Sequence, residues 1–158
     1  MPDLLVPLYH LPGPVEMNGI WIGRPPSHLA HRVAGYVGDN FGERWRSESL
    51  SSLRAVPPKM LVAVEEGAGG IKGFCCWDAT ALGFLGPVGV SPEARGRGIG
   101  KALVLRCLSM MRDQGYGYAV IGAAGPVGFF QSFCDARPIE GSEPGIYHCP
   151  IDGSSRPD

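Results

Sequence analysis

The sequence predicts a single domain of mixed α/β (α+β) class, and three observations support that prediction. The chain has 158 residues, enough for one hydrophobic core of ordinary size but not for two. Hydrophobic residues make up 44% of the chain and the formal net charge is −1, which excludes a wholly disordered chain. Short apolar runs between Gly and Pro residues alternate with helical periodicities, as expected for one sheet covered by helices.

The first third of the chain predicts two strands followed by two helices. Leu4 to Tyr9 is a short apolar run, which we expect to form an extra N-terminal strand within residues 1–17. Gly19 to Gly23 is a second run rich in strand-forming residues. From Leu29 to Trp45 apolar residues recur at every fourth position, as in a helix, and Gly42 predicts a break into two pieces.

Three strands are predicted next: Met60 to Val64, Ile71 to Trp77 and Leu82 to Val90. The glycine-rich turn over residues 67–70 joins the first two as a hairpin. Gly86-Pro87 interrupts the third strand, because proline has no N–H to donate to a neighbour. We therefore expect a bulge or a splay at that point.

The clearest helix runs from Gly98 to Gln114, because its apolar residues fall on one half of a helical wheel. After it we expect a strand at Tyr118 to Ile121 and a short helix from Gly125-Pro126 to Phe133. Two final strands are predicted, at residues 136–139 and 146–147. Residues 151–158 are predicted to be a disordered polar tail, which leaves 1–150 as the single domain.

Composition excludes several functional classes. The N-terminus lacks the basic stretch and cleavage site of a signal peptide, and the uncharged segment 114–134 contains too many glycines for a membrane helix. Five cysteines without metal-ligand spacing predict reduced thiols and no metal site. Fourteen Lys and Arg against fifteen acidic residues give no basic field for a nucleic acid. We expect a cytoplasmic protein with no membrane or nucleic-acid partner.

The segment 90–101 is glycine-rich and basic, and it joins a strand to the clearest helix. Glycines let several backbone N–H groups converge, and the helix N-terminus adds unsatisfied N–H groups and a positive dipole end, so this segment predicts a diphosphate site. A Walker loop is excluded because Arg95 replaces its first glycine and Ala102 its hydroxyl residue. A dinucleotide fingerprint is excluded because Lys101 or Leu103 takes the place of its third glycine. A tight turn with solvated arginines is the alternative.

This segment resembles the coenzyme A loop of the GNAT N-acetyltransferase superfamily, Arg/Gln-x-x-Gly-x-Gly/Ala, through Arg95, Gly98 and Gly100. The order of predicted elements from Gly19 to Tyr147 is also that of the superfamily. The resemblance implies a mostly antiparallel central sheet with helices on both faces. It also implies that the superfamily's fourth and fifth strands splay apart to admit pantetheine.

The resemblance further implies acetyl-CoA as cosubstrate and no metal. The diphosphate would be held by backbone N–H groups from Arg97 to Lys101, and pantetheine would pair with Val88 and Val90. Phe130 occupies the position of the tyrosine that commonly serves as general acid, so that acid is missing here. The implied cofactor-binding set is Val88, Gly89, Val90, Arg95, Gly96, Arg97, Gly98, Ile99, Gly100, Lys101 and Phe130.

For catalysis we expect Tyr147 as a substitute acid, with Cys134 as a second candidate and a packing role as the alternative for both. Asp78, in a turn between two strands, is the expected base, and Glu65 and Glu66 are its alternatives.

The predicted function is acetyl transfer from acetyl-CoA directly to a primary amine of a small molecule or peptide. The alternative function is a non-catalytic module that binds acyl-CoA as a sensor, or binds a protein partner. A homodimer is compatible with either function.

Overall fold

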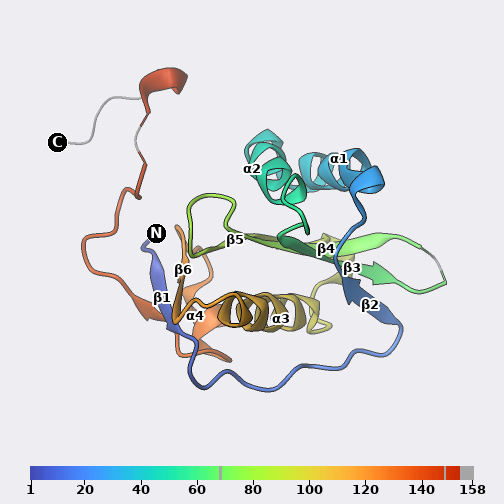
Figure 1. Cartoon of the computed structure of the whole chain (residues 1–158), viewed down its shortest axis with the longest axis horizontal. Coiled ribbons are helices and arrows are strands. Elements are labelled where there is room, and N and C mark those ends of the chain that lie inside the picture. The colour runs from blue at the N-terminus through green and yellow to red at the C-terminus, as the bar shows by residue number, and fades with distance from the viewer. Residues whose placement is uncertain (68, 148, 154–158) are drawn as a thin grey trace.

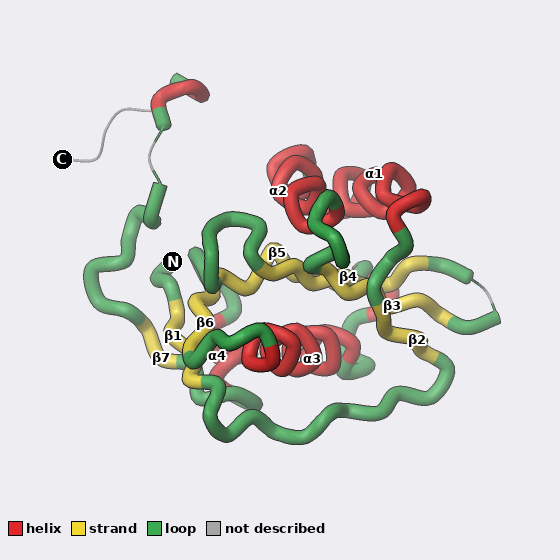
Figure 2. Tube along the Cα trace, in the orientation of Figure 1, coloured by secondary structure: helices red, strands yellow, loops and turns green. Residues whose placement is uncertain are grey.

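The computed structural model describes residues 1–67, 69–147 and 149–153. Its strands form one mixed sheet in the order β2-β3-β4-β5-β6-β1-β7 (Figures 1 and 2). Neighbouring strands are antiparallel except β5 and β6, which are parallel. The strands are β1 (Leu4–Pro7), β2 (Ile20–Gly23), β3 (Met60–Glu65), β4 (Ile71–Trp77), β5 (Phe84–Val90), β6 (Tyr118–Ile121) and β7 (Arg137–Pro138). The predicted mixed, mostly antiparallel sheet is confirmed.

Helices cover both faces of the sheet, as predicted. Figure 1 shows α1 (Ala30–Phe41) and α2 (Glu43–Leu53) on one face and α3 (Ile99–Asp113) and α4 (Val127–Gln131) on the other. Gly42 separates α1 from α2 with a φ of 99°, in the left-handed region that glycine adopts readily. Short 3-10 turns occupy Ser27–Leu29, Pro92–Ala94 and Pro150–Asp152.

Alternate residues of the central strands divide between two apolar layers. Phe74 and Cys76 of β4 pack with Val37 of α1, whereas Cys75 and Trp77 pack on the α3 side. This division follows from strand geometry, because successive side chains point to opposite faces. The layers explain why residues 74–77 of β4 are all apolar rather than alternately apolar and polar.

The extra N-terminal strand lies inside the sheet rather than at its edge. β1 pairs with β6 through Leu4–Ile121 and Val6–Ala119, and its other edge pairs with β7. The side chains of Leu4 and Val6 are fully buried. The beginning of the chain therefore lies between β6 and β7 in the sheet.

The C-terminal part differs from the prediction. Ile146 and Tyr147 do not form the predicted strand; they are 58% and 69% exposed and lie in an irregular segment. β7, which pairs with the outer edge of β1, is only two residues long and is the last strand of the described chain. Of the predicted disordered tail, residues 154–158 lie outside the described residues, and 150–152 form a 3-10 turn. Within the described part of the chain, no helix is long and apolar enough to cross a membrane.

Candidate active site

The loop between β5 and α3 is built to expose backbone N–H groups. Gly96 and Gly98 have φ values of 81° and 86°, and Gly98 forms the N-cap of α3. Such backbone conformations suit glycine, because an L side chain is strained there. Among the described residues, none of the N–H groups from Gly96 to Lys101 donates a hydrogen bond to another protein group. The loop therefore presents a row of free donors at a helix N-terminus, the geometry that binds anions.

Buried contacts fix the start of this loop. Ser91, which is 1% exposed, shares a hydrogen bond of 2.6 Å with the hydroxyl of Tyr36 on α1. Burial raises the pKa of Tyr36, so this hydroxyl keeps its proton. Past the loop, a Cβ placed on Gly100 would lie 3.3 Å from the ring of Phe129, so α4 packs closely on the first turn of α3. The free N–H groups thus lie between two anchored segments.

The basic side chains of the loop are partly engaged with protein groups. Arg97 forms an ion pair with Glu65, with Nη1 3.3 Å from Oε1. The Arg95 Nε donates to the carbonyl of Val90 at 3.1 Å. Lys101 lies over the ring of Phe133, 6.0 Å from its centroid. An anion arriving at the N–H groups would therefore compete with Glu65 for Arg97.

β5 diverges from β6 where the sequence predicted a splay. The two strands pair only through Phe84–Val120 and Leu85–Ile121, immediately before Gly86-Pro87. Beyond this point the opposite edge of β5 remains paired with β4, through Val88–Cys75 and its neighbours. The edge of Val88, Gly89 and Val90 that faces away from β4 is thus left without a strand partner in the described residues. It offers backbone groups to a ligand that lies between the strands.

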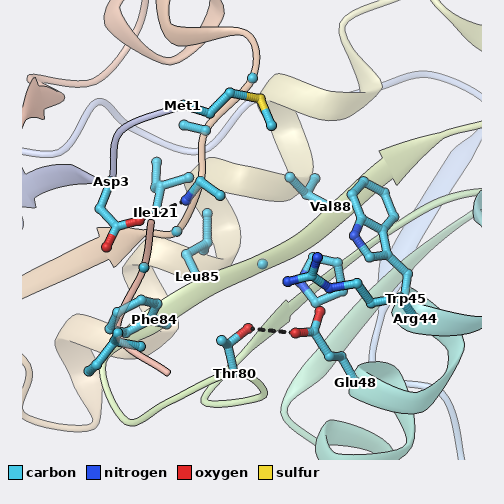
Figure 3. A pocket seen from close by; sticks show the side chains of 18 of the residues that line it. Met1, Asp3, Arg44, Trp45, Glu48, Thr80, Phe84, Leu85, Val88 and Ile121 are labelled. Atoms are coloured by element: carbon cyan, nitrogen blue, oxygen red, sulfur yellow. Dashed lines mark hydrogen bonds between the residues drawn. The ribbon is translucent and has the colours of Figure 1, made fainter. Parts of the chain in front are cut away.

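A cavity of about 430 Å³ opens at this divergence (Figure 3). Its walls come from β5, the loop after β6, helices α2 and α4, and the C-terminal segment. The lining includes Phe84, Leu85, Gly86, Pro87, Val88, Ile121, Phe130 and Tyr147 together with Arg44, Trp45, Glu48 and Thr80. The cavity therefore adjoins the open edge of β5, and it is lined largely by apolar groups, as binding cavities commonly are.

One wall of the cavity carries charge that the sequence analysis missed. Arg44, Trp45 and Glu48 of α2 line the cavity together with Leu85 and Val88 of β5, and Figure 3 shows Glu48 turned toward Thr80. Thr80 donates a hydrogen bond of 3.3 Å to the Glu48 Oε1 atom. The sequence pattern that could have identified these residues is their spacing of i, i+1 and i+4, which places the three side chains near one face of a helix. Which face meets the cavity depends on how α2 docks on the sheet.

Besides Val88, two predicted residues line the cavity, and they differ in chemistry. Phe130 is 2% exposed and supplies an apolar surface with no proton to donate. Tyr147 is largely exposed and brings a phenol from the C-terminal segment to the cavity lining. Cys134 is 6% exposed, and its thiol donates to the carbonyl of Phe130 at 3.1 Å. Burial raises the pKa of Cys134 to about 11, which suits a packing role.

Asp78 lies outside this cavity and is fully engaged elsewhere. Its carboxylate is 2% exposed and forms an ion pair of 2.9 Å with Lys59. It also accepts hydrogen bonds from the hydroxyl of Tyr116 at 2.9 Å and from the N–H of Gly83 at 2.8 Å. Burial, and next the contact with Asp78, raise the pKa of Tyr116. The structure gives Asp78 the surroundings of a turn anchor, because every side of its carboxylate meets a donor.

Comparison with known proteins identifies the family of the chain. The family model described as "Acetyltransferase (GNAT) family" matches residues 30–130. No curated protein sequence matches the chain.

Several solved structures share the fold. A GCN5-related glucosamine N-acetyltransferase region of a fungal multi-domain GH3 β-N-acetylglucosaminidase is 18% identical, with a TM-score of 0.72 over 87% of this chain and 19% of that one. A GCN5-related N-acetyltransferase from Sphaerobacter thermophilus is 23% identical, with a TM-score of 0.71 over 87% and 48%. A GNAT acetyltransferase from Brucella melitensis, solved with acetyl-CoA, is 22% identical, with a TM-score of 0.50 over 84% and 97%. The chain spans less than half the length of the first two.

Proposed function

Because this chain belongs to the GNAT acetyltransferase family, we propose that it transfers an acetyl group from acetyl-CoA directly to a primary amine. The observation that supports this most strongly is a continuous arrangement of three features. Free N–H groups lie from Gly96 to Lys101, the open edge of β5 lies beside them, and a cavity lies beyond. Acetyl-CoA has three parts that match these features in the same order: a diphosphate, an arm that bears amides, and a thioester.

In this proposal the coenzyme diphosphate accepts hydrogen bonds from the N–H groups of the loop, including those of Gly98 and Gly100. Anionic acceptors make such bonds about twice as strong as neutral ones do. The pantetheine amides pair with the free edge of Val88 and Val90, as an added strand would. The acyl end then lies in the cavity beside Phe130, where most of the lining is apolar.

The transfer requires one bond to form and one to break. The amine nitrogen attacks the thioester carbon, the C–N bond forms, and the C–S bond breaks to release the coenzyme thiolate. An ammonium must first lose a proton, and we assign that proton to Glu48. Its Oε1 accepts only the Thr80 hydroxyl among the described residues, so lone pairs remain for the amine. We do not carry Asp78 forward as the base, because its lone pairs are already taken.

The departing thiolate needs a proton from another group. Phe130 cannot supply one, and Tyr147 is the phenol that lines the cavity. We therefore propose Tyr147 as the acid and solvent as its substitute. The absence of tyrosine at position 130 also favours a second function, a module that binds acyl-CoA without turnover.

A thiol-release assay separates the two functions. Purified protein, acetyl-CoA and a library of primary amines are mixed, and free coenzyme thiol is measured. We expect release that depends on an amine, and we expect Glu48→Gln to lower turnover about 100-fold with an unchanged Kd for acetyl-CoA.

Glu43→Gln is the matched control. Glu43 lies on the same helix but pairs with Arg46 at the surface, at 3.4 Å. Such exposed pairs contribute little, so this variant should keep wild-type turnover. Tight acetyl-CoA binding without release for any amine would contradict the enzymatic proposal and support the binding module.

A further inference from the structure

We infer that the acceptor is a small zwitterion, an amine that also carries a carboxylate, and that Arg44 selects it by binding the carboxylate. This inference rests on the proposed function and names the substrate class of the same cavity. Arg44 and Glu48 are one helical turn apart on α2, and both line the cavity (Figure 3). The wall thus presents a cation and an anion together.

Arg44 differs from the other arginines near the site because it has no protein partner. Among the described residues it forms no ion pair and no hydrogen bond, whereas Arg46 pairs with Glu43 and Arg97 with Glu65. A guanidinium is a planar fork of donors that matches a carboxylate in a bidentate arrangement. A free guanidinium on a cavity wall is therefore ready to bind an anionic group of a ligand.

Glu48 supplies the complementary charge. It is half-buried, and Thr80 holds its Oε1 atom at 3.3 Å, which fixes the carboxylate while leaving Oε2 free among the described residues. Oε2 can accept a hydrogen bond from an ammonium, and Glu48 is also the proposed proton acceptor. The amine would then be held at the α2 wall of the cavity that Val88 of β5 also lines.

The spacing of the two charges limits the acceptor's size. Side chains at positions i and i+4 of a helix have Cβ atoms about 5–6 Å apart. An ammonium and a carboxylate only a few bonds apart, as in a free amino acid, span the two groups without strain. A protein lysine side chain would bring the ammonium without a nearby carboxylate and would leave Arg44 unpaired.

Charge balance leads to the same class of acceptor. Asp3, another carboxylate of the cavity wall, differs from Glu48 because it is buried, at 8% exposed, and its Oδ1 atom accepts the N–H of Ala123 at 2.8 Å. A zwitterion adds no net charge to a largely apolar cavity, whereas an amine with no anionic group would add one positive charge. The remaining wall, with Trp45, Phe84 and Pro87, offers room for an apolar side chain.

The test measures acetyl transfer from acetyl-CoA to a panel of free α-amino acids, each paired with its own amide. The amide keeps the amine and the side chain but lacks the carboxylate. We expect wild type to prefer the acids, and Arg44→Gln to lower kcat/KM for the best acid about tenfold through a raised KM. The same variant should leave the paired amide within about twofold.

Arg46→Gln is the matched control, because Arg46 is on the same helix but pairs with Glu43 at the surface. Arg46→Gln should leave kcat/KM unchanged for both the amino acid and its amide in each pair. Amides acetylated as well as acids by wild type, or an equal effect of Arg44→Gln on both, would overturn the inference while leaving the proposed function intact. Preference for phosphoethanolamine over every amino acid would overturn the carboxylate assignment. No thiol release with any amine would overturn the proposed function itself.

Discussion

Replacing Gly98 with valine tests the coenzyme loop at its most constrained position. Gly98 is the N-cap of α3 with a φ of 86°, and no atom lies within 4 Å of the position its Cβ would take. Valine therefore meets no steric obstacle from neighbours, but the left-handed backbone conformation strains it. Relief of that strain would turn the adjacent N–H groups away from their common direction.

Both effects have expected magnitudes. A residue forced into a sparsely populated backbone region costs about 1–3 kcal/mol, and each kcal/mol lowers Tm by about 2–4 °C in a domain of this size. Losing one charge-assisted hydrogen bond to the diphosphate costs about 1.5–3 kcal/mol. That loss raises the Kd for coenzyme A by about 10- to 150-fold.

The control is Gly115→Val, at the other end of α3. Gly115 has a φ of 108° and also has no atom within 4 Å of its Cβ position, so valine is similarly strained there. Calorimetric titration with coenzyme A and thermal unfolding are measured for both variants. We expect both to lose thermal stability and only Gly98→Val to lose affinity. An unchanged Kd in Gly98→Val, or an equal loss in Gly115→Val, would refute the assignment of the loop.

Three further predictions concern single side chains. Tyr147→Phe should lower turnover about 100-fold with an unchanged Kd for acetyl-CoA, and wild-type turnover would leave solvent as the acid. Asp78→Asn should lower the free energy of unfolding in urea by about 2 kcal/mol, because Lys59 loses its partner. The folded variant should keep its turnover. Lost turnover with wild-type stability would restore Asp78 as the base. Burial raises the pKa of Cys76 from 9.0 to about 12, so the folded thiol stays protonated at pH values where the unfolded thiol ionises. This contribution to stability is fully present below pH 9.0 and is lost as the pH rises toward 12, with a slope of up to about 1.4 kcal/mol per pH unit. Cys76→Ala should flatten that slope in unfolding experiments, and an identical slope would show that Cys76 does not titrate as described.

Local sequence patterns predicted most of the fold because the elements are strongly marked. The apolar face of α3, the break at Gly42 and the divergence after Gly86-Pro87 each follow from residues close together in the chain. The place of β1 did not follow from such patterns, because pairing with β6 joins residues more than a hundred positions apart. Ile146 and Tyr147 were predicted as a strand from their apolar character, yet they are exposed and form no strand in the described residues.

The residues of the candidate site likewise fall into those that local sequence predicts and those that depend on contacts between distant segments. The proposed coenzyme loop could be predicted from the sequence because it is one contiguous segment with glycines at fixed spacing. The proposed roles of Glu48 and Arg44 could not be predicted from the sequence, because they depend on which face of α2 meets the cavity. Asp78 was chosen for its position in a turn, and its contacts with Lys59 and Tyr116 become visible only when those segments meet in space.

The most direct test of the account is a titration of ¹⁵N-labelled protein with coenzyme A, followed through its backbone amide resonances. The account predicts that the amide protons of Gly98 and Gly100 shift strongly downfield as they donate to the diphosphate, and that those of Val88 and Val90 shift with them. The amide of Gly115, at the far end of α3, should not move. Saturable binding that leaves the resonances from Gly96 to Lys101 in place would contradict the central claim.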